Sequence, residues 1–321
     1  MREFHIGKND ENQRLDRFLG KAIPLLPASL AQKYIRLKRI KVNGARAQRD
    51  QKLVAGDILQ CYINDEFFES PSEENVYLTI TTPRLKIVYE DENIMLLDKP
   101  AGMLAHADEH EKVNTLVNHM LAYLYQKREW RPREENAFTP ALCNRIDRNT
   151  GGIVVAAKNA EALRILNDKI RDREIAKYYL CIALGRVEPP KGCIECFLRK
   201  DEKSNTVRVY HRPVPEGRSA VTLYQTLRTR GELSLLEVEL LTGRTHQIRA
   251  HMASIGCPIL GDSKYGNNTA NRELKLKYQA LCAWELTMPR FTQPDFEFLS
   301  GKTFRAPKPW YYSQVLDGTL K

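Results

Sequence analysis

The chain has 321 residues, and its 50 lysines and arginines outnumber its 40 aspartates and glutamates to give a net charge of +10. No apolar run approaches the length of a membrane span, and the charged first residues, MREFHIGKNDENQR, are unlike a secretory signal. Seven cysteines, odd in number and scattered, suit reduced thiols better than a disulfide framework. These features predict a cytoplasmic globular protein with a polyanionic partner, for which nucleic acid is the first candidate.

The positive charge is concentrated in the first 64 residues. Thirteen basic residues stand there against six acidic ones, a net charge of +7, whereas residues 65–75, DEFFESPSEEN, contain five acids and no base. This change of sign, together with Pro71 and two serines, predicts an acidic linker over residues 65–82. We therefore expect a small basic domain at residues 11–64 and a larger domain at residues 83–321.

Within the basic domain, the apolar spacing predicts two short helices. Leu15, Phe18 and Leu19 share one face of the first. The second is expected to begin with a capping box formed by Ser29 and Gln32. Basic residues crowd the remainder of this second helix and the turn after it, namely Lys33, Arg36, Lys38 and Arg39.

A hairpin is predicted at Val42-Asn43-Gly44, because Asn-Gly supplies the positive φ angles of a type I′ turn, and a strand should follow at residues 57–63. Two helices, the second basic, followed by this hairpin resemble the S4 RNA-binding module over residues 11–64. A basic helix can equally be an ordinary solvated face, so the charge by itself does not decide between these interpretations.

The larger domain should contain both strands and helices. Cys193 and Cys196 form a lone C-x-x-C in a strand-like stretch, which indicates ordinary thiols and neither a zinc site nor a redox pair. Strands are predicted at residues 85–89, 93–97, 153–155 and 177–186, and helices at residues 113–124 and after the N-cap Asn159.

The stretch from residue 144 to residue 158, NRIDRNTGGIVVAAK, places one carboxylate, Asp147, between Arg145 and Arg148. Turn-forming residues then lead into a buried strand, so the acid lies on a loop that enters a sheet. The flanking guanidinium groups favour the ionised carboxylate, which could act as a nucleophile or a base. The same residues are good turn chemistry, and taken by themselves they favour a turn-capping aspartate.

The second informative stretch covers residues 241–266, LTGRTHQIRAHMASIGCPILGDSKYG. Thr245 is expected to cap a helix whose apolar stripe contains Ile248, Met252 and Ile255. Arg249 lies off that stripe, on an element rigid enough to hold its guanidinium against a carboxylate or a phosphate.

Two pairs of histidines raise the question of a metal. His106 and His110 fit an H-x-x-E-H zinc pattern, but they follow a Pro/Gly loop, a poor place for the long helix that this pattern needs. His246 and His251 could be ligands, general bases or packing groups, and packing is favoured because no acid stands at metal-ligand spacing. We expect no metal.

Several motifs resemble those of the RluA-type pseudouridine synthases. The motifs are Lys99-Pro100-x-Gly102, Arg145-Ile146-Asp147-x-x-Thr150-x-Gly152, Lys177-x-Tyr179, and Gly243-Arg244-x-His246-Gln247-Ile248-Arg249 followed by Gly261-Asp262-x-x-Tyr265-Gly266. With the S4-like module, the resemblance is strongest to the large-subunit ribosomal RNA branch that includes RluC and RluD. A tRNA-directed enzyme is the alternative. Asn144, Gly151 and Cys181 depart from the residues usual in the family.

The resemblance implies that the chain isomerises uridine to pseudouridine in RNA as a monomer, without a metal or cofactor. It also implies an α+β fold, in which the catalytic domain has a mixed, largely antiparallel sheet flanked by helices. Asp147 matches the family's catalytic aspartate, Arg249 its arginine partner and Tyr179 its active-site tyrosine. Whether the aspartate attacks the base, attacks C1′ or removes a ribose proton is left open.

RNA contacts are expected around this site and on the small domain. Arg145 matches the arginine that would fill the space left by a flipped-out base. Further contacts are expected from Arg148, Arg244, Lys33, Arg36, Lys38 and Arg39. Two other function classes remain, a catalytically silent S4-type RNA-binding protein and a metal-dependent hydrolase that uses His106 and His110.

Overall fold

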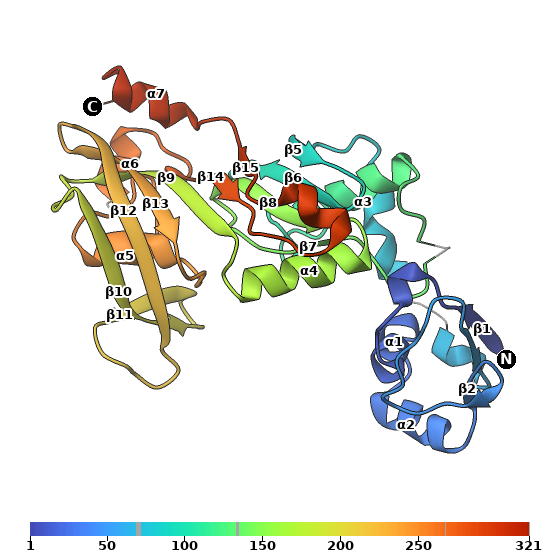
Figure 1. Cartoon of the computed structure of the whole chain (residues 1–321). Coiled ribbons are helices and arrows are strands. Elements are labelled where there is room, and N and C mark those ends of the chain that lie inside the picture. Colours follow the sequence, from blue (N-terminus) through green and yellow to red (C-terminus); the bar gives the residue numbers. More distant parts are fainter. Residues whose placement is uncertain (69–71, 133–134, 267, 321) are drawn as a thin grey trace.

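The computed structural model describes residues 1–68, 72–132, 135–266 and 268–320. The chain forms a small N-terminal module, which projects from one end of a larger elongated part (Figure 1). None of the helices in these described ranges is long and apolar enough to cross a membrane.

The N-terminal module is a four-stranded antiparallel sheet packed against two helices. The strands lie in the order β1 (Arg2–His5), β4 (Ile58–Cys61), β2 (Ile40–Val42) and β3 (Ala45–Arg46), and the helices are α1 (Leu15–Ala22) and α2 (Ala28–Arg36). The apolar face predicted for α1 is confirmed, since Leu15, Phe18 and Leu19 are buried in the core of the module. β1 belongs to this sheet although it precedes the residues predicted for the domain.

The hairpin prediction is confirmed, because Asn43 and Gly44 have φ angles of 52° and 75° between β2 and β3. The predicted capping box of the second helix is wrong. α2 begins two residues earlier, with Pro27 at the N-cap, and no side chain caps it. Proline fixes its own φ and donates no N–H, so the ring sets the direction of the chain into the helix.

The acidic segment contains two 3-10 helices, η2 (Asp65–Phe68) and η3 (Ser72–Thr79). Phe67 and Phe68 pack against the core of the module, whereas Tyr77 and Ile80 are buried with α3 (Leu116–Gln126) of the larger part. The segment therefore packs against both parts of the molecule.

The described residues of the larger part form a mixed sheet, mostly antiparallel, as expected. Its main strands run in the order β11, β10, β12, β13, β9, β14, β8, β6 and β5, with β15 paired to β14 and β7 to β8. β14 lies between β9 and β8, and its pairing with β8 is parallel. The strands are β5 (Ile87–Glu90), β6 (Ile94–Lys99), β7 (Ala141–Leu142), β8 (Gly151–Ala157), β9 (Ala176–Leu184), β10 (Lys191–Asp201), β11 (Thr206–Tyr210), β12 (Arg218–Arg230), β13 (Leu233–Leu240), β14 (Leu281–Thr287) and β15 (Thr303–Arg305).

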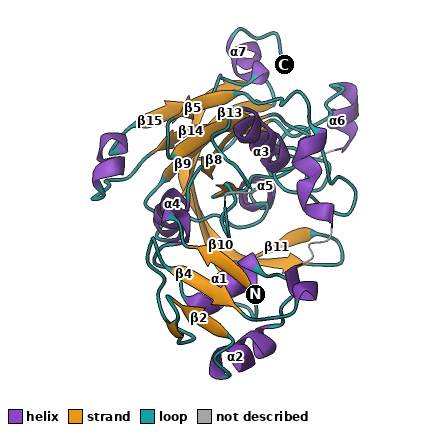
Figure 2. Cartoon of the chain, turned by 90° about the vertical axis from the view of Figure 1, so that its right-hand side faces the viewer, coloured by secondary structure: helices purple, strands orange, loops and turns teal. Residues whose placement is uncertain are grey.

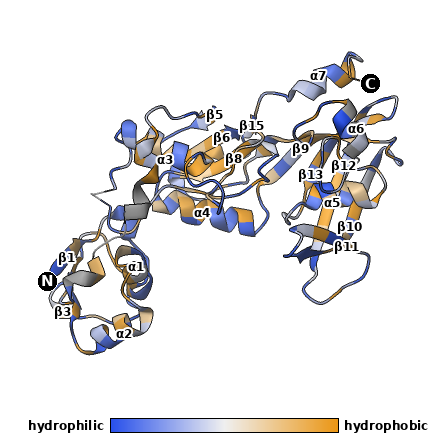
Figure 3. Cartoon of the chain, turned by 180° about the vertical axis from the view of Figure 1, so that it is seen from behind, coloured by the Kyte–Doolittle hydropathy of each residue, from blue (hydrophilic) through white to orange (hydrophobic). Residues whose placement is uncertain are grey.

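Helices cover both faces of this sheet (Figure 2). Alternate residues of β6 and β8 face α3 on one side and α4 (Ala160–Arg171) on the other, because successive side chains of a strand point to opposite faces. The hydrophobic colouring of β6 and β8 in Figure 3 reflects this burial on both sides. The remaining short helices are η1 (Lys8–Asp10), α5 (Gln247–Ser254), α6 (Asn268–Glu273), η4 (Pro294–Leu299) and α7 (Trp310–Leu316).

A small polar contact holds the module against the larger part. The Asn9 side-chain oxygen accepts a hydrogen bond from the N–H of Ala160 at 3.1 Å, at the first turn of α4. Asn136 donates to the Asp10 carboxylate at 2.9 Å. The predicted N-cap of α4 is confirmed, since the Asn159 side chain accepts from the N–H of Ala162 at 2.8 Å.

Gly152 allows the close approach of β8 and β14. Its φ is 108°, and a Cβ at this position would overlap the backbone carbonyl of Ala283. Gly152→Ala is therefore expected to lower the free energy of unfolding by about 3 kcal/mol or more, because both the backbone angle and the strand contact must change. Urea titration would measure the loss.

The matched control is Gly243→Ala in the same part of the chain, where a Cβ would meet no atom within 4 Å. Its effect should stay within about 1 kcal/mol. Equal losses for the two variants would contradict the steric argument.

Candidate active site

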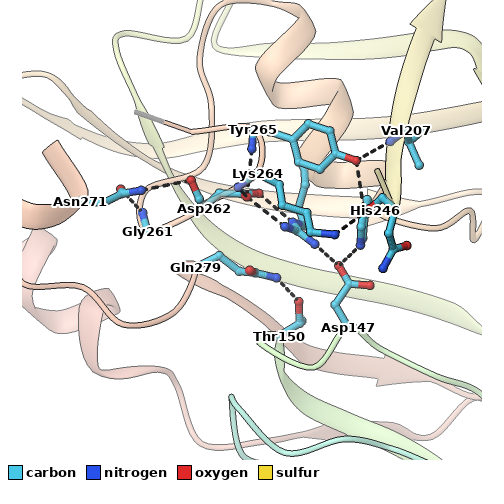
Figure 4. A network of polar contacts seen from close by, with 12 residues as sticks. Asp147, Thr150, Val207, His246, Gly261, Asp262, Lys264, Tyr265, Asn271 and Gln279 are labelled. Atoms are coloured by element: carbon cyan, nitrogen blue, oxygen red, sulfur yellow. Dashed lines mark hydrogen bonds and ion pairs between the residues drawn. The ribbon is translucent and has the colours of Figure 1, made fainter. Parts of the chain in front are cut away.

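Asp147 lies on the loop between β7 and β8. Its backbone carbonyl accepts the N–H of Thr150 at 3.0 Å, so the residue does lie in a turn, but its side chain does not cap that turn. The carboxylate, however, points away from this turn and toward α5 (Figure 4). With 27% of its side chain exposed, Asp147 remains accessible to a ligand.

Arg249 binds two carboxylates at once. Its Nη1 donates to Asp147 at 2.8 Å, while Nε and Nη2 donate to the two oxygens of Asp262 at 2.7 and 2.9 Å. Asp262 is fully buried, and one of its oxygens also accepts backbone N–H groups from Lys264 and Tyr265. The fork-shaped contact fixes the guanidinium plane, so the remaining nitrogen points at Asp147.

The charges in this cluster stabilise one another. Burial by itself would lower the pKa of Arg249, but the hydrogen bonds and charges of Asp262 and Asp147 raise it above its usual value. Burial likewise opposes ionisation of Asp262, yet the hydrogen bonds from Arg249 hold its pKa below the ordinary value. Arg249 and Asp262 therefore stay charged at neutral pH, as a buried ion pair that one further carboxylate extends.

The start of α5 differs from the prediction. Thr245 does not cap the helix, because His246 occupies the N-cap position with φ 52°, and no side chain makes a capping hydrogen bond. Gln247 anchors this end instead, since its amide oxygen accepts from Thr242 and its amide nitrogen donates to Thr222 in β12. These contacts hold α5 against the sheet and thereby position Arg249.

His246 lies between Asp147 and the aromatic residue Tyr265. Its Nδ1 lies 2.9 Å from the hydroxyl of Tyr265, which accepts the N–H of Val207 at 2.6 Å. Its Nε2 lies 3.9 Å from the Asp147 carboxylate (Figure 4). Burial lowers the pKa of His246 although Asp147 opposes this, so the imidazole is mainly neutral at neutral pH. His251, by contrast, packs in the interior with its Nε2 3.0 Å from the sulfur of Cys196.

Tyr179 lies on β9 and is buried beside Ile248 and Met252 of α5. Burial and the negative charge of Asp147 raise the pKa of its phenol well above the usual value. The phenol is therefore neutral at neutral pH. Tyr179 also packs in one hydrophobic cluster with Ile146 and Ile248, the chain neighbours of Asp147 and Arg249. The structure thus brings together Asp147, Arg249 and Tyr179, which come from three separate segments of the chain.

Lys99 is a fully buried lysine that braces the loop of Asp147. Its Nζ donates to the backbone carbonyls of Pro100, Met103 and Arg148 at 3.1, 2.7 and 2.9 Å. No role was predicted from the sequence for Lys99 or Asp262. Their place in the motifs Lys-Pro-x-Gly and Gly-Asp-x-x-Tyr-Gly was the feature that could have indicated one.

The expected RNA-contacting residues lie in two regions. Arg145 and Arg148 are exposed beside Asp147, and Arg148 donates to the carbonyl of Gly102 at 3.2 Å. Arg244 is half-buried before α5, where it donates to the carbonyl of Ser219 at 3.1 Å. The exposed bases of the module lie apart from this site, on α2 and the turn after it (Figure 1), and are Lys33, Arg36, Lys38 and Arg39.

The stretch from His106 to His110 is not helical, so the zinc-peptidase geometry is not formed. Within the described ranges, no three His, Cys, Asp or Glu side chains are grouped so that they could hold a metal ion. Cys193 is exposed and Cys196 is buried on β10, and both are free thiols.

Asp262 holds the guanidinium of Arg249 in the interior. Asp262→Ala would leave part of that charge buried without a partner, so we expect the free energy of unfolding to fall by about 3–5 kcal/mol. Asp168→Asn removes an exposed partner of Arg171 and should cost less than about 1 kcal/mol. Chemical denaturation of both variants would test this difference, and similar losses would contradict it.

Lys99 should make stability depend on pH. Burial lowers its pKa from 10.5 to about 8, although the charge of Asp147 opposes the shift. Between these two pH values the unfolded chain keeps a proton that the folded chain releases. The free energy of unfolding therefore gains a contribution that rises with pH in this window, by up to about 1.4 kcal/mol per unit.

Lys99→Met removes this contribution, so its free energy of unfolding should rise less between about pH 8 and pH 10 than that of the wild type. Lys86→Met, at an exposed lysine before β5, is the control and should follow the wild type. Urea titrations at several pH values give the comparison. Parallel curves for Lys99→Met and the wild type would contradict the assignment.

Comparisons with known proteins identify the family of the chain. The family model described as RNA pseudouridylate synthase matches residues 93–254. An RNA pseudouridine synthase of Mycoplasma genitalium, labelled uncharacterized, is 31% identical over 96% of this chain and 97% of its own length. Ribosomal large subunit pseudouridine synthase C of Rickettsia felis is 30% identical over 80% of this chain and 82% of its own. Ribosomal large subunit pseudouridine synthase D of Nitrosomonas europaea is 30% identical over 89% of this chain and 80% of its own length.

Solved structures show the same fold. Human RNA pseudouridylate synthase domain containing 4 superposes with a TM-score of 0.55 and 23% identity, over 72% of this chain and 91% of its own. Human RNA pseudouridylate synthase domain containing 1 gives a TM-score of 0.54 and 19% identity, over 78% of this chain and 97% of its own. The chain therefore belongs to the family of RNA pseudouridylate synthases, isomerases that convert uridine to pseudouridine in RNA.

Proposed function

We propose that the chain modifies uridines of large-subunit ribosomal RNA and that Asp147 is its catalytic carboxylate. One observation carries the assignment of the residue. Asp147 is a partly exposed carboxylate held at 2.8 Å by a buried arginine that a second carboxylate fixes in place. The relatives named as synthases C and D act on the ribosomal large subunit by their names, which supports the choice of target.

The reaction needs few groups from the protein. The bond between N1 of uracil and C1′ of ribose breaks, the base turns, and C5 bonds to C1′ while C5 loses a proton and N1 gains one. No electrons are transferred to a cofactor. An ionised Asp147 can attack the base or C1′, or remove a ribose proton, and each route requires its charge to survive beneath a bound base.

Arg249 serves this requirement by holding the carboxylate ionised as the base excludes water. Tyr179 supplies an aromatic surface next to Asp147. Because its phenol is neutral, it would contact the uracil as an uncharged ring that also has a hydroxyl to offer. We assign both residues to the active site.

RNA binding would involve both parts of the molecule. We propose an S4-like RNA-binding domain at residues 11–64, an acidic linker at residues 65–82 and a catalytic domain at residues 83–321. A base must leave its stack before it can reach Asp147, and exposed Arg145 stands where it could fill the gap. Phosphates would be held by Arg148, by Arg244 and by the basic residues of α2 and the turn after it. We further propose a cytoplasmic monomer.

Asp147→Asn tests the catalytic role. The side chain keeps its shape and can still bond to Arg249, so we expect the variant to fold and to bind RNA. Pseudouridine formation should fall by at least about 1000-fold, because the reacting charge is lost. Cells that lack the gene would be supplied with the wild type or the variant, and pseudouridines would be mapped in ribosomal RNA and tRNA.

The control is Asp168→Asn, which removes a carboxylate from the surface of α4 and should restore every modification. Full activity of Asp147→Asn would overturn the catalytic assignment. Modification of tRNA alone would overturn the ribosomal target while leaving the catalytic assignment intact.

A further inference from the structure

Three arginines come together where three neighbouring strands begin or end. In the sheet, Tyr178 of β9 lies opposite Glu239 of β13, and Leu240 of β13 lies opposite Thr222 of β12. The start of β9, the end of β13 and the start of β12 therefore share one edge of the sheet. Arg173 lies three residues before β9 and Arg244 four residues after β13, while Arg218 is the first residue of β12.

Arg244 is the centre of this cluster, which we call the arginine cluster. Its Nε donates to the carbonyl of Ser219 at 3.1 Å, which seats it beside Arg218. Burial lowers the pKa of Arg244, and the positive charges of Arg173 and Arg218 lower it further. Among the residues that the structure describes, no acidic side chain lies within ion-pair distance of these three guanidinium groups. Like charges gathered without a counter-charge favour an anionic ligand.

Arg173 stands at a backbone position that favours glycine. α4 ends in two hydrogen bonds, from Arg173 to the carbonyl of Ile170 and from Glu174 to that of Lys169. This pattern places the residue after the C-cap in the left-handed region, and Arg173 has φ 61°. Glycine is more favourable than arginine in this conformation, so the backbone gives no reason for an arginine here. Arg171, by contrast, bonds to Asp168 and Asp172.

The cluster lies next to the proposed catalytic carboxylate. Arg244 is two residues from His246, whose Nε2 is 3.9 Å from Asp147. Two residues span at most about 7 Å of chain, so a strand of RNA with its uracil at Asp147 would pass the arginines with its flanking phosphates. Guanidinium groups bind phosphate oxygens through paired N–H donors.

We propose that Arg173, Arg218 and Arg244 form a binding site for the backbone phosphates that flank the target uridine. The site deepens the proposed function, since it rests on RNA as the substrate. It would contribute affinity and position the strand without reading sequence, because phosphate contacts carry no base information.

Arg173→Gly is the sharpest test, because it removes the guanidinium and places the favoured residue at this helix end. Its melting temperature should equal or exceed that of the wild type. Arg128→Gly is the matched control. Arg128 occupies the same position after α3, with φ 61°, and its replacement removes the same charge. Figure 1 shows α3 at the end of the larger part that carries the N-terminal module, whereas α4 ends toward β9. Arg218→Gln is the second test variant.

The measurement is the affinity for a fluorescently labelled single-stranded oligouridylate of about 20 nucleotides, between about 50 and 200 mM salt. Arg173→Gly and Arg218→Gln should each bind several-fold more weakly at low salt. Each should also reduce the slope of log affinity against log salt by about 0.7, the value for one phosphate contact on a single strand. Arg128→Gly should keep the wild-type slope.

Equal slopes for Arg173→Gly, Arg218→Gln and Arg128→Gly would overturn the phosphate site. A melting temperature that inorganic phosphate raises in the wild type but not in Arg173→Gly, with RNA slopes unchanged, would also overturn it, since the cluster would then hold a free anion. These readouts do not use catalysis. Failure of the Asp147 assignment would therefore appear separately, as pseudouridine formation by Asp147→Asn.

Discussion

The contact on which this site depends is the guanidinium of Arg249 held between two carboxylates. Asp262 occupies two of its nitrogens from a fully buried position, so the third can reach the partly exposed Asp147. One positive and two negative charges leave the group with a net charge of −1, an unusual surface to offer to RNA. Positive charge must then be supplied nearby. Arg145 and Arg148 flank the carboxylate in the chain, and the proposed arginine cluster would add to them.

The geometry is prepared from both sides of Asp147. On one side α5 is anchored to β12 through Gln247, which fixes Arg249. On the other, Lys99 binds the carbonyl of Arg148 and so fixes the chain directly after the carboxylate. Each support uses buried polar groups with satisfied hydrogen bonds, which hold a side chain more rigidly than a loop could alone.

Much of the fold could be predicted from the sequence where the signal is local. Apolar spacing located α1 and α4, and Asn-Gly located the hairpin between β2 and β3. Helix starts were less predictable, because a capping pattern such as Ser29 and Gln32 competes with the proline before it. His246 in the left-handed region could not be foreseen either, since residues other than glycine are uncommon there and nothing in the neighbouring sequence requires it.

For the site, residue types alone favoured a turn at Asp147, and only the resemblance to a family joined it to Arg249, 102 residues away. Lys99 and Asp262 show the limit of local reasoning. A lysine or an aspartate is expected at the surface. The neighbouring sequence does not indicate that three carbonyls would surround Lys99 or that a guanidinium from another segment would bind Asp262. The arginine cluster has the same origin, because strand register brings its members together.

The position of β14 has a consequence for folding during synthesis on the ribosome. The strands that carry the Asp147 loop and Tyr179, β8 and β9, do not pair with each other; β14 separates and joins them. Since β14 ends at Thr287, the ribosome must make the first 287 residues before the two sides of the proposed catalytic centre can be held together. A nascent chain could already present its basic first domain to RNA, yet chemistry must wait until β14 has been made.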